Sequence, residues 1–181
     1  QFEVDVIVLQ EGESGGDSLG SGSISFDFLG DISGTYSASG PLVSNQTEND
    51  GVGAILTLLE GEDLETTYEG LSLLGFHPTG DRKVDVFLLS TKIDAFLPAI
   101  EPGNSYGIGP LAPFNGLFLN GLDITEFWAG EANFIETADR AFVLKLGLVS
   151  IASRDSTHFT GSFFGTTHPN QTPLSKEYLV R

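Results

Sequence analysis

Short runs of alternating apolar and polar residues are the feature that most constrains the fold of this chain. The alternation is clearest in residues 2–6, 23–28 and 83–87. Because side chains two positions apart lie on the same face of a strand, each run has one apolar face and predicts a half-buried β-strand. Runs of the same kind, separated by Gly, Asn, Asp and Pro, predict further strands at 32–38, 53–59, 66–74, 105–108, 114–119, 141–152 and 157–166.

The pattern predicts an all-β protein in which helix is minor. Only residues 90–97 and 125–134 have a composition that allows one or two helical turns. A chain of 181 residues fits one domain, so we expect a single domain over 1–181. Many short strands with long connections favour an antiparallel two-sheet β-sandwich, or a jelly-roll-like arrangement of two sheets.

Two segments share a pattern of apolar, hydroxyl, Gly, hydroxyl and aromatic residues. They are Ile32–Tyr36 and Phe159–Phe163, and each follows a strand and a tight turn that contains Asp. We interpret them as parts of two hairpins, at 22–38 and 147–166. In each, an aromatic side chain on a neighbouring strand can cover the bare glycine.

Three segments in the C-terminal part of the chain have a shared character: Pro102–Tyr106, Gly147–Ile151 and His158–Phe163. They resemble the last strands of a class of mostly uncharacterised exported bacterial β-sandwich proteins of the cell envelope. The resemblance implies a β-sandwich of the envelope and gives no catalytic residue. The acidic first part of the chain is outside the resemblance.

Composition indicates an extracytoplasmic protein, periplasmic or secreted. The chain starts at Gln1 and contains no Met, which we interpret as a mature product whose signal peptide has been removed. It contains no Cys, so disulfides, thiolate metal sites and thiol nucleophiles are excluded. No apolar run approaches the roughly 20 residues that span a bilayer, and we expect no direct membrane insertion.

Charge is distributed very unevenly along the sequence. Residues 1–81 contain fifteen Asp and Glu and no Lys or Arg, whereas residues 82–181 contain ten acids and eight bases. A chain with a net charge of -17 is repelled by phosphate backbones, so we expect no nucleic-acid partner. Such a polarised subunit can orient itself toward a basic protein surface.

Acid-rich segments are the candidate metal sites. Carboxylates that lie close together in sequence can bind Ca²⁺. The candidates are Glu48, Asp50, Glu60, Glu62 and Asp63. Their spacing matches no known calcium loop, and a solvated acidic face explains them as well. We therefore predict no cofactor, with calcium as the open alternative.

Aromatic residues in the second half of the chain are the candidate contact residues. Trp128, with Phe127 beside it, suits a protein interface, a sugar platform or simple packing. Phe114 and Phe118 belong to a loop rich in Pro and Phe, residues 97–118, which we expect to join Trp128 in an apolar contact face.

The sequence thus predicts a non-catalytic protein that acts through protein–protein contacts. We expect an accessory or structural subunit of a larger envelope assembly, either a periplasmic subunit of a membrane complex or part of an extracellular filament. Its partners would be other proteins of that assembly or further copies of itself. The alternatives are a module that binds carbohydrate or calcium, and a hydrolase, for which the sequence offers no activated nucleophile.

Overall fold

The computed structural model describes residues 1–10, 13, 18–29, 33–43, 49–63, 65–80, 82–123, 125 and 137–167. This part of the chain confirms the all-β prediction. Within it, no helix has the length and apolar character needed to cross a lipid bilayer. The strands are β1 (Phe2–Gln10), β2 (Ser18–Phe28), β3 (Gly34–Val43), β4 (Gly51–Glu60), β5 (Thr67–Gly80), β6 (Lys83–Thr91), β7 (Ser105–Ile108), β8 (Phe114–Asp123), β9 (Ala138–Leu144), β10 (Leu146–Arg154) and β11 (His158–Thr166).

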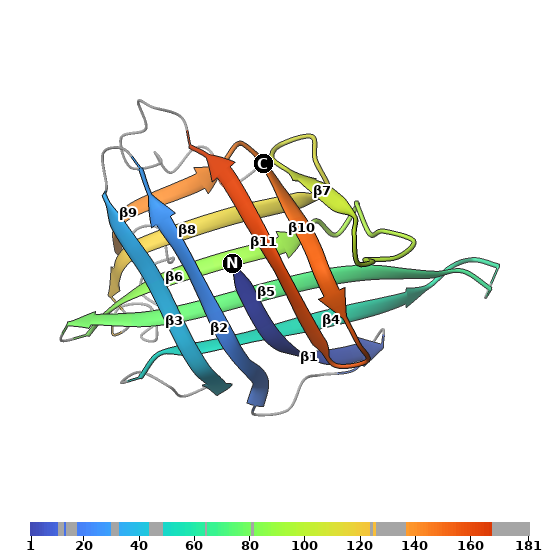
Figure 1. The fold of residues 1–181 in the computed structure, drawn as a ribbon, viewed down its shortest axis with the longest axis horizontal. Coiled ribbons are helices and arrows are strands. Elements are labelled where there is room, and N and C mark those ends of the chain that lie inside the picture. Colours follow the sequence, from blue (N-terminus) through green and yellow to red (C-terminus); the bar gives the residue numbers. More distant parts are fainter. Residues whose placement is uncertain are drawn as a thin grey trace.

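The strands pair into one ring-like sheet. Its order in the described chain is β6-β5-β4-β3-β2-β1-β11-β10-β7-β8-β9, and β6 also pairs with β8. Figure 1 shows two layers whose strands cross: β3, β2, β11 and β10 lie in front, and β4, β5, β6, β8 and β9 lie behind. Two separate sheets are not confirmed, because β1 and β7 connect the layers by main-chain pairing.

Strand β1 joins the layers because its two halves have different neighbours. Phe2, Glu3 and Val4 pair with both β2 and β11 in the front layer. Val6–Gln10 then pairs in parallel with β4 of the back layer. The alternation predicted for this strand is present, since Phe2, Val4 and Val6 are buried and Glu3 and Asp5 are exposed.

The main hydrophobic core lies between the two layers. It combines side chains of the front layer, such as Val4 and Phe159, with side chains of the back layer, such as Leu73 and Phe87. A second, smaller cluster consists of Val84, Val86, Leu119, Leu122 and Ala141. Since residues of β6 alternate between the two clusters, this strand is apolar on both faces.

Both predicted hairpins are present, as β2–β3 and β10–β11. At Gly161 the covering aromatic is Phe2 of β1, the residue paired with it. A Cβ atom at this glycine would lie 2.5 Å from Cζ of Phe2. Two expectations differ from the structure. The strand predicted at 141–152 is divided at Lys145, where the chain passes from β9 in the back layer to β10 in the front layer, and residues 92–95 form a turn rather than a helix.

Candidate interaction surface

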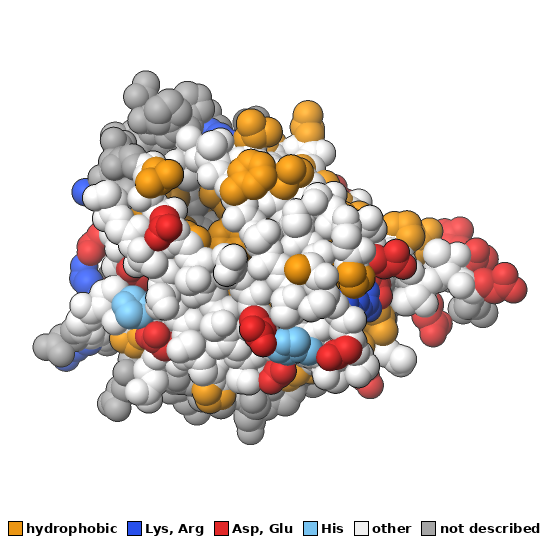
Figure 2. Space-filling view, viewed as in Figure 1, with side chains coloured by type: hydrophobic (Ala, Val, Ile, Leu, Met, Phe, Trp, Pro, Cys, Tyr) orange, Lys and Arg blue, Asp and Glu red, His pale blue; other side chains and the backbone are white. Residues whose placement is uncertain are grey.

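Three large apolar side chains are exposed together on the outer face of β10 and β11. Leu146 is 70 % exposed, Leu148 39 % and Phe164 63 %. Leu148 and Phe164 are directly paired across the two strands, and Leu146 lies two residues before Leu148 on the same face. We call these three residues the apolar patch. Figure 2 shows apolar side chains gathered over the upper part of this face.

The apolar patch is extended by the loop that follows β7. Leu148 pairs with Gly107 of β7. Ala112 covers this glycine, since a Cβ atom added at Gly107 would lie 3.0 Å from the Cβ atom of Ala112. Leu111, the residue before Ala112, is fully exposed. Contiguous exposed apolar groups of this kind mark protein contact sites more often than single exposed residues do.

Four acidic side chains of the first half lie together at one extremity. The β4–β5 hairpin extends beyond the layers in Figure 1, and acidic side chains gather at its tip in Figure 2. Glu60, Glu62, Asp63 and Glu65 of this hairpin are all exposed. Asp63 accepts hydrogen bonds from the Thr66 hydroxyl at 3.0 Å and the Thr66 amide at 3.2 Å, which lower the pKa of its carboxyl. The β4–β5 hairpin therefore carries an exposed acidic group at its tip.

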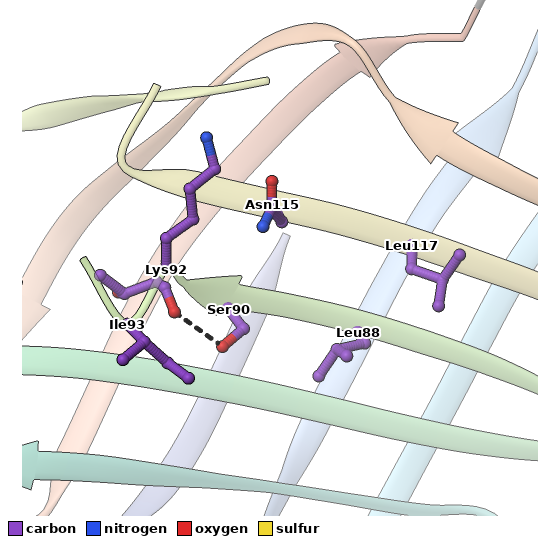
Figure 3. Close-up of a pocket in the computed structure, with 7 residues that line it drawn as sticks. Leu88, Ser90, Lys92, Ile93, Asn115 and Leu117 are labelled. Carbon is purple, nitrogen blue, oxygen red and sulfur yellow. Dashed lines mark hydrogen bonds between the residues drawn. The ribbon is translucent and has the colours of Figure 1, made fainter. Parts of the chain in front are cut away.

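An open groove of about 320 Å³ lies on β6 and β8. Figure 3 shows that Leu88 and Leu117 line one part, while Ser90, Asn115 and Lys92 line the other. The Lys92 ammonium donates hydrogen bonds to the carbonyl oxygens of Gly109 at 2.8 Å and Pro110 at 2.7 Å. The Lys92 ammonium is therefore bound to the loop that follows β7. The groove offers mainly alkyl surface.

A part-buried ion pair connects the two layers and was not anticipated from the sequence. The two terminal nitrogen atoms of the Arg154 guanidinium, Nη1 and Nη2, donate to the Glu69 carboxylate, at 2.6 and 2.7 Å. The Ile100 amide donates to the same carboxylate at 2.6 Å. These hydrogen bonds to Glu69 raise the pKa of Arg154. The guanidinium also lies 4.9 Å from the centre of the Phe159 ring, a cation–π geometry.

A charged cluster at the surface fastens β1 to β11. Nδ1 of His158 lies 3.1 Å from Asp5, and its Nε2 lies 3.4 Å from Glu3. The hydrogen bond to Asp5 raises the pKa of His158. The Ser21 hydroxyl donates to Asp5 at 2.8 Å, and this bond, together with that to His158, lowers the pKa of Asp5.

The structure corrects the predicted aromatic contact face. Phe114 and Phe118 are 0 % and 4 % exposed and pack in the main core, so their side chains are not available to a partner. The reason is that both point to the inner face of β8, whereas Asn115 and Leu117 point outward. Phe127 and Trp128 lie outside the described residues.

The calcium candidates are not brought together. Asp50 lies beside His77, with its carboxylate 2.8 Å from Nδ1 of the ring. Glu60, Glu62 and Asp63 are on the β4–β5 hairpin, and Glu48 lies outside the described residues. In the ranges that the structure describes, no group of three or more His, Asp or Glu side chains is arranged to hold a metal ion.

One sequence signal could have located the apolar patch. Phe163 and Phe164 are adjacent in a predicted strand, so one of the two rings must point outward. The structure places Phe163 inward, stacked on Phe87 with ring centres 4.7 Å apart, and Phe164 outward.

Comparisons with known protein families, with curated proteins and with solved structures give no match for this chain.

Proposed function

We propose that this chain is a non-catalytic, extracytoplasmic subunit that works by contact with other proteins of an envelope assembly. The observation that carries the proposal is the apolar patch formed by Leu146, Leu148 and Phe164. Outward apolar side chains on paired strands cost solubility, and they contribute free energy when a partner covers them. The resemblance of the C-terminal strands to exported envelope proteins supports the same proposal.

The separation of the apolar patch from the acidic β4–β5 hairpin supports an oriented contact. A basic surface on a partner would attract the hairpin from a distance, and the apolar patch would supply short-range affinity. Opposed sheets of the sandwich type, as predicted from the sequence, would hold both features on one rigid body.

The test is chemical cross-linking of the tagged full chain in its native cells, followed by purification. We expect specific cross-linked species from the unaltered chain and their loss in the double variant Leu148→Asn and Phe164→Asn. Leu29→Asn is the matched control, because Leu29 is 96 % exposed and lies outside the apolar patch. A chain recovered only as a free monomer, or equal loss in the control, would contradict the proposal.

A further inference from the structure

A row of alkyl side chains crosses the outer face of the back layer. It consists of four residues that are paired in turn across β5, β6, β8 and β9, namely Leu74, Leu88, Leu117 and Val143. We call them the alkyl row. Leu88 and Leu117 point away from the main core, because the residue beside each of them along its strand points inward. All four are only partly buried, whereas a sheet face that meets water is normally polar.

The alkyl row is bordered by a row of polar residues. Ser72, Ser90 and Asn115 are paired in turn on β5, β6 and β8, two positions along each strand from the alkyl row. The Ser90 hydroxyl is engaged, since it lies 2.8 Å from the Ser72 hydroxyl and 3.2 Å from the carbonyl oxygen of Thr91. The exposed side-chain amide of Asn115 makes no hydrogen bond with any residue that the structure describes. Its N–H groups are therefore available to a ligand.

The groove of about 320 Å³ on β6 and β8 spans the boundary between these two rows. In Figure 3, Leu88 and Leu117 lie on one side of it, and Ile93 lies with Lys92 on the other, beyond the polar row. A hollow of this volume is large enough to hold a small organic molecule. Its lining passes from alkyl to polar along the strands, which is the pattern that an amphiphile matches.

Lys92 gives the polar part of the groove a positive charge. Its ammonium has three N–H groups, and two of them donate to the carbonyl oxygens of Gly109 and Pro110, so one remains. Among the described carboxylates, none lies within ion-pair distance of this ammonium. A cation without a paired carboxylate, beside the free amide of Asn115, favours an anionic head group.

We propose that the groove binds a soluble single-chain carboxylic acid, with its carboxylate at Asn115 and Lys92 and its alkyl chain along the alkyl row. In this orientation no charged group lies against alkyl surface. The alkyl row spans three interstrand spacings, about 14 Å, and so suits a chain of medium length. The site uses none of the residues of the apolar patch and does not rest on the proposed contact function.

The test is an NMR titration of the full chain with sodium octanoate. We expect saturable shifts of the signals of Leu88, Leu117 and Asn115. Hexanoate should bind about fivefold more weakly, because it lacks two CH₂ groups and an open groove buries each of them only in part. Octyltrimethylammonium should bind about threefold more weakly than octanoate, although the net charge of the chain, -17, favours a cation.

Two variants separate the head of the ligand from its chain. Asn115→Asp places a carboxylate beside the head group and should weaken octanoate binding about threefold while leaving 1-octanol binding unchanged. Leu117→Asn removes alkyl surface and should weaken both ligands equally, about fivefold. The matched control is the double variant Leu148→Asn and Phe164→Asn of the apolar patch, which should bind octanoate as the unaltered chain does. Thermal unfolding shows that each variant is folded.

Several results would overturn the inference. These are shifts far from the groove, equal binding of hexanoate and octanoate, tighter binding of octyltrimethylammonium, or unchanged octanoate binding by Asn115→Asp. Phosphatidylglycerol vesicles that shift the groove signals when octanoate does not would make a membrane surface the occupant and overturn the choice of ligand. If cross-linking through the apolar patch succeeds while octanoate fails, the contact function stands and the groove site does not.

Discussion

The two halves of the space between β2 and β11 differ in how the chain fills them. In the lower half, Phe2, Glu3 and Val4 supply a third strand that pairs on both sides. In the upper half, toward Phe28 and Thr166, the aromatic rings of Phe26, Phe28 and Phe163 pack against one another and against the main core. The difference teaches that the space between two strands can be occupied by paired main chain in one part and by packed side chains in another.

Charged contacts follow the same division. Glu69 and Arg154, and also His158 and Asp5, lie around the lower half, close to where β10 and β11 join. In the upper half, the contacts are made by packed aromatic rings. We therefore expect substitutions in the lower half to change the stability of the fold more than substitutions in the upper half do.

The largest effect is expected where the ion pair of the lower half is broken. Glu69→Ala leaves the Arg154 guanidinium and the Ile100 amide without their carboxylate and should lower the free energy of unfolding by about 3 kcal/mol. Urea denaturation measures it. The double variant Glu69→Met with Arg154→Met should recover much of the loss, and full stability of Glu69→Ala alone would show that the ion pair does not hold the layers together.

Two glycines on the same face of β11 compare the halves directly. A Cβ atom at Gly161 would collide with the Ser150 carbonyl oxygen and with Phe2, whereas one at Gly165 would meet only the Leu144 side chain, at 3.0 Å or more. Gly161→Ala should therefore cost about 2 kcal/mol or more, and Gly165→Ala less than about 1 kcal/mol. Thermal unfolding of the two variants gives the comparison, and equal costs would remove the distinction.

A buried hydroxyl beneath the upper half gives a smaller effect of opposite sign. Tyr36 stacks on Phe26 with ring centres 4.9 Å apart, and its hydroxyl has no hydrogen-bond partner in the described part of the chain. Burial, with Asp85 and Asp50 nearby, raises the pKa of Tyr36. Tyr36→Phe should raise the free energy of unfolding by about 1 kcal/mol. Destabilisation by this change would indicate that the hydroxyl contributes to folding.

The smallest effect is the pH dependence of the lower half. Because the folded state raises the pKa of His158, its protonated ring stabilises the fold fully below the unfolded-state pKa of about 6.5. That contribution should disappear as pH rises through the folded-state pKa. His158→Gln should remove this slope from a series of denaturation curves near neutral pH, and an unchanged slope would assign it to another group.

The sequence predicts individual strands better than their assembly. Alternation locates β1, β2 and β6 because successive residues of a strand point to opposite faces, and apolar residues recur on the faces that are buried. It cannot show that β6 pairs with β8, or that the end of β1 runs parallel to β4, because these pairings join segments far apart in the chain. The two-layer crossing depends on them.

The same limit explains the outcome for the candidate residues. Composition located acidic residues that the structure places at the β4–β5 hairpin, but it could not tell that Phe114 and Phe118 face the core. Which face of β8 is internal depends on β6, its partner. The Glu69–Arg154 pair joins residues 85 positions apart and has no local signal.

Amide hydrogen exchange of the full chain tests the central claim most directly. The account predicts slow exchange at Val6 and Ser25, whose amides donate to Thr157 and Gln1 where β1 pairs with β11 and β2. It also predicts slow exchange at Phe26, Phe28 and Phe164, whose residues pair with β3 and β10. Fast exchange at Val6 and Ser25 in the folded chain would mean that main-chain pairing of β1 does not join the two layers, and would contradict the account.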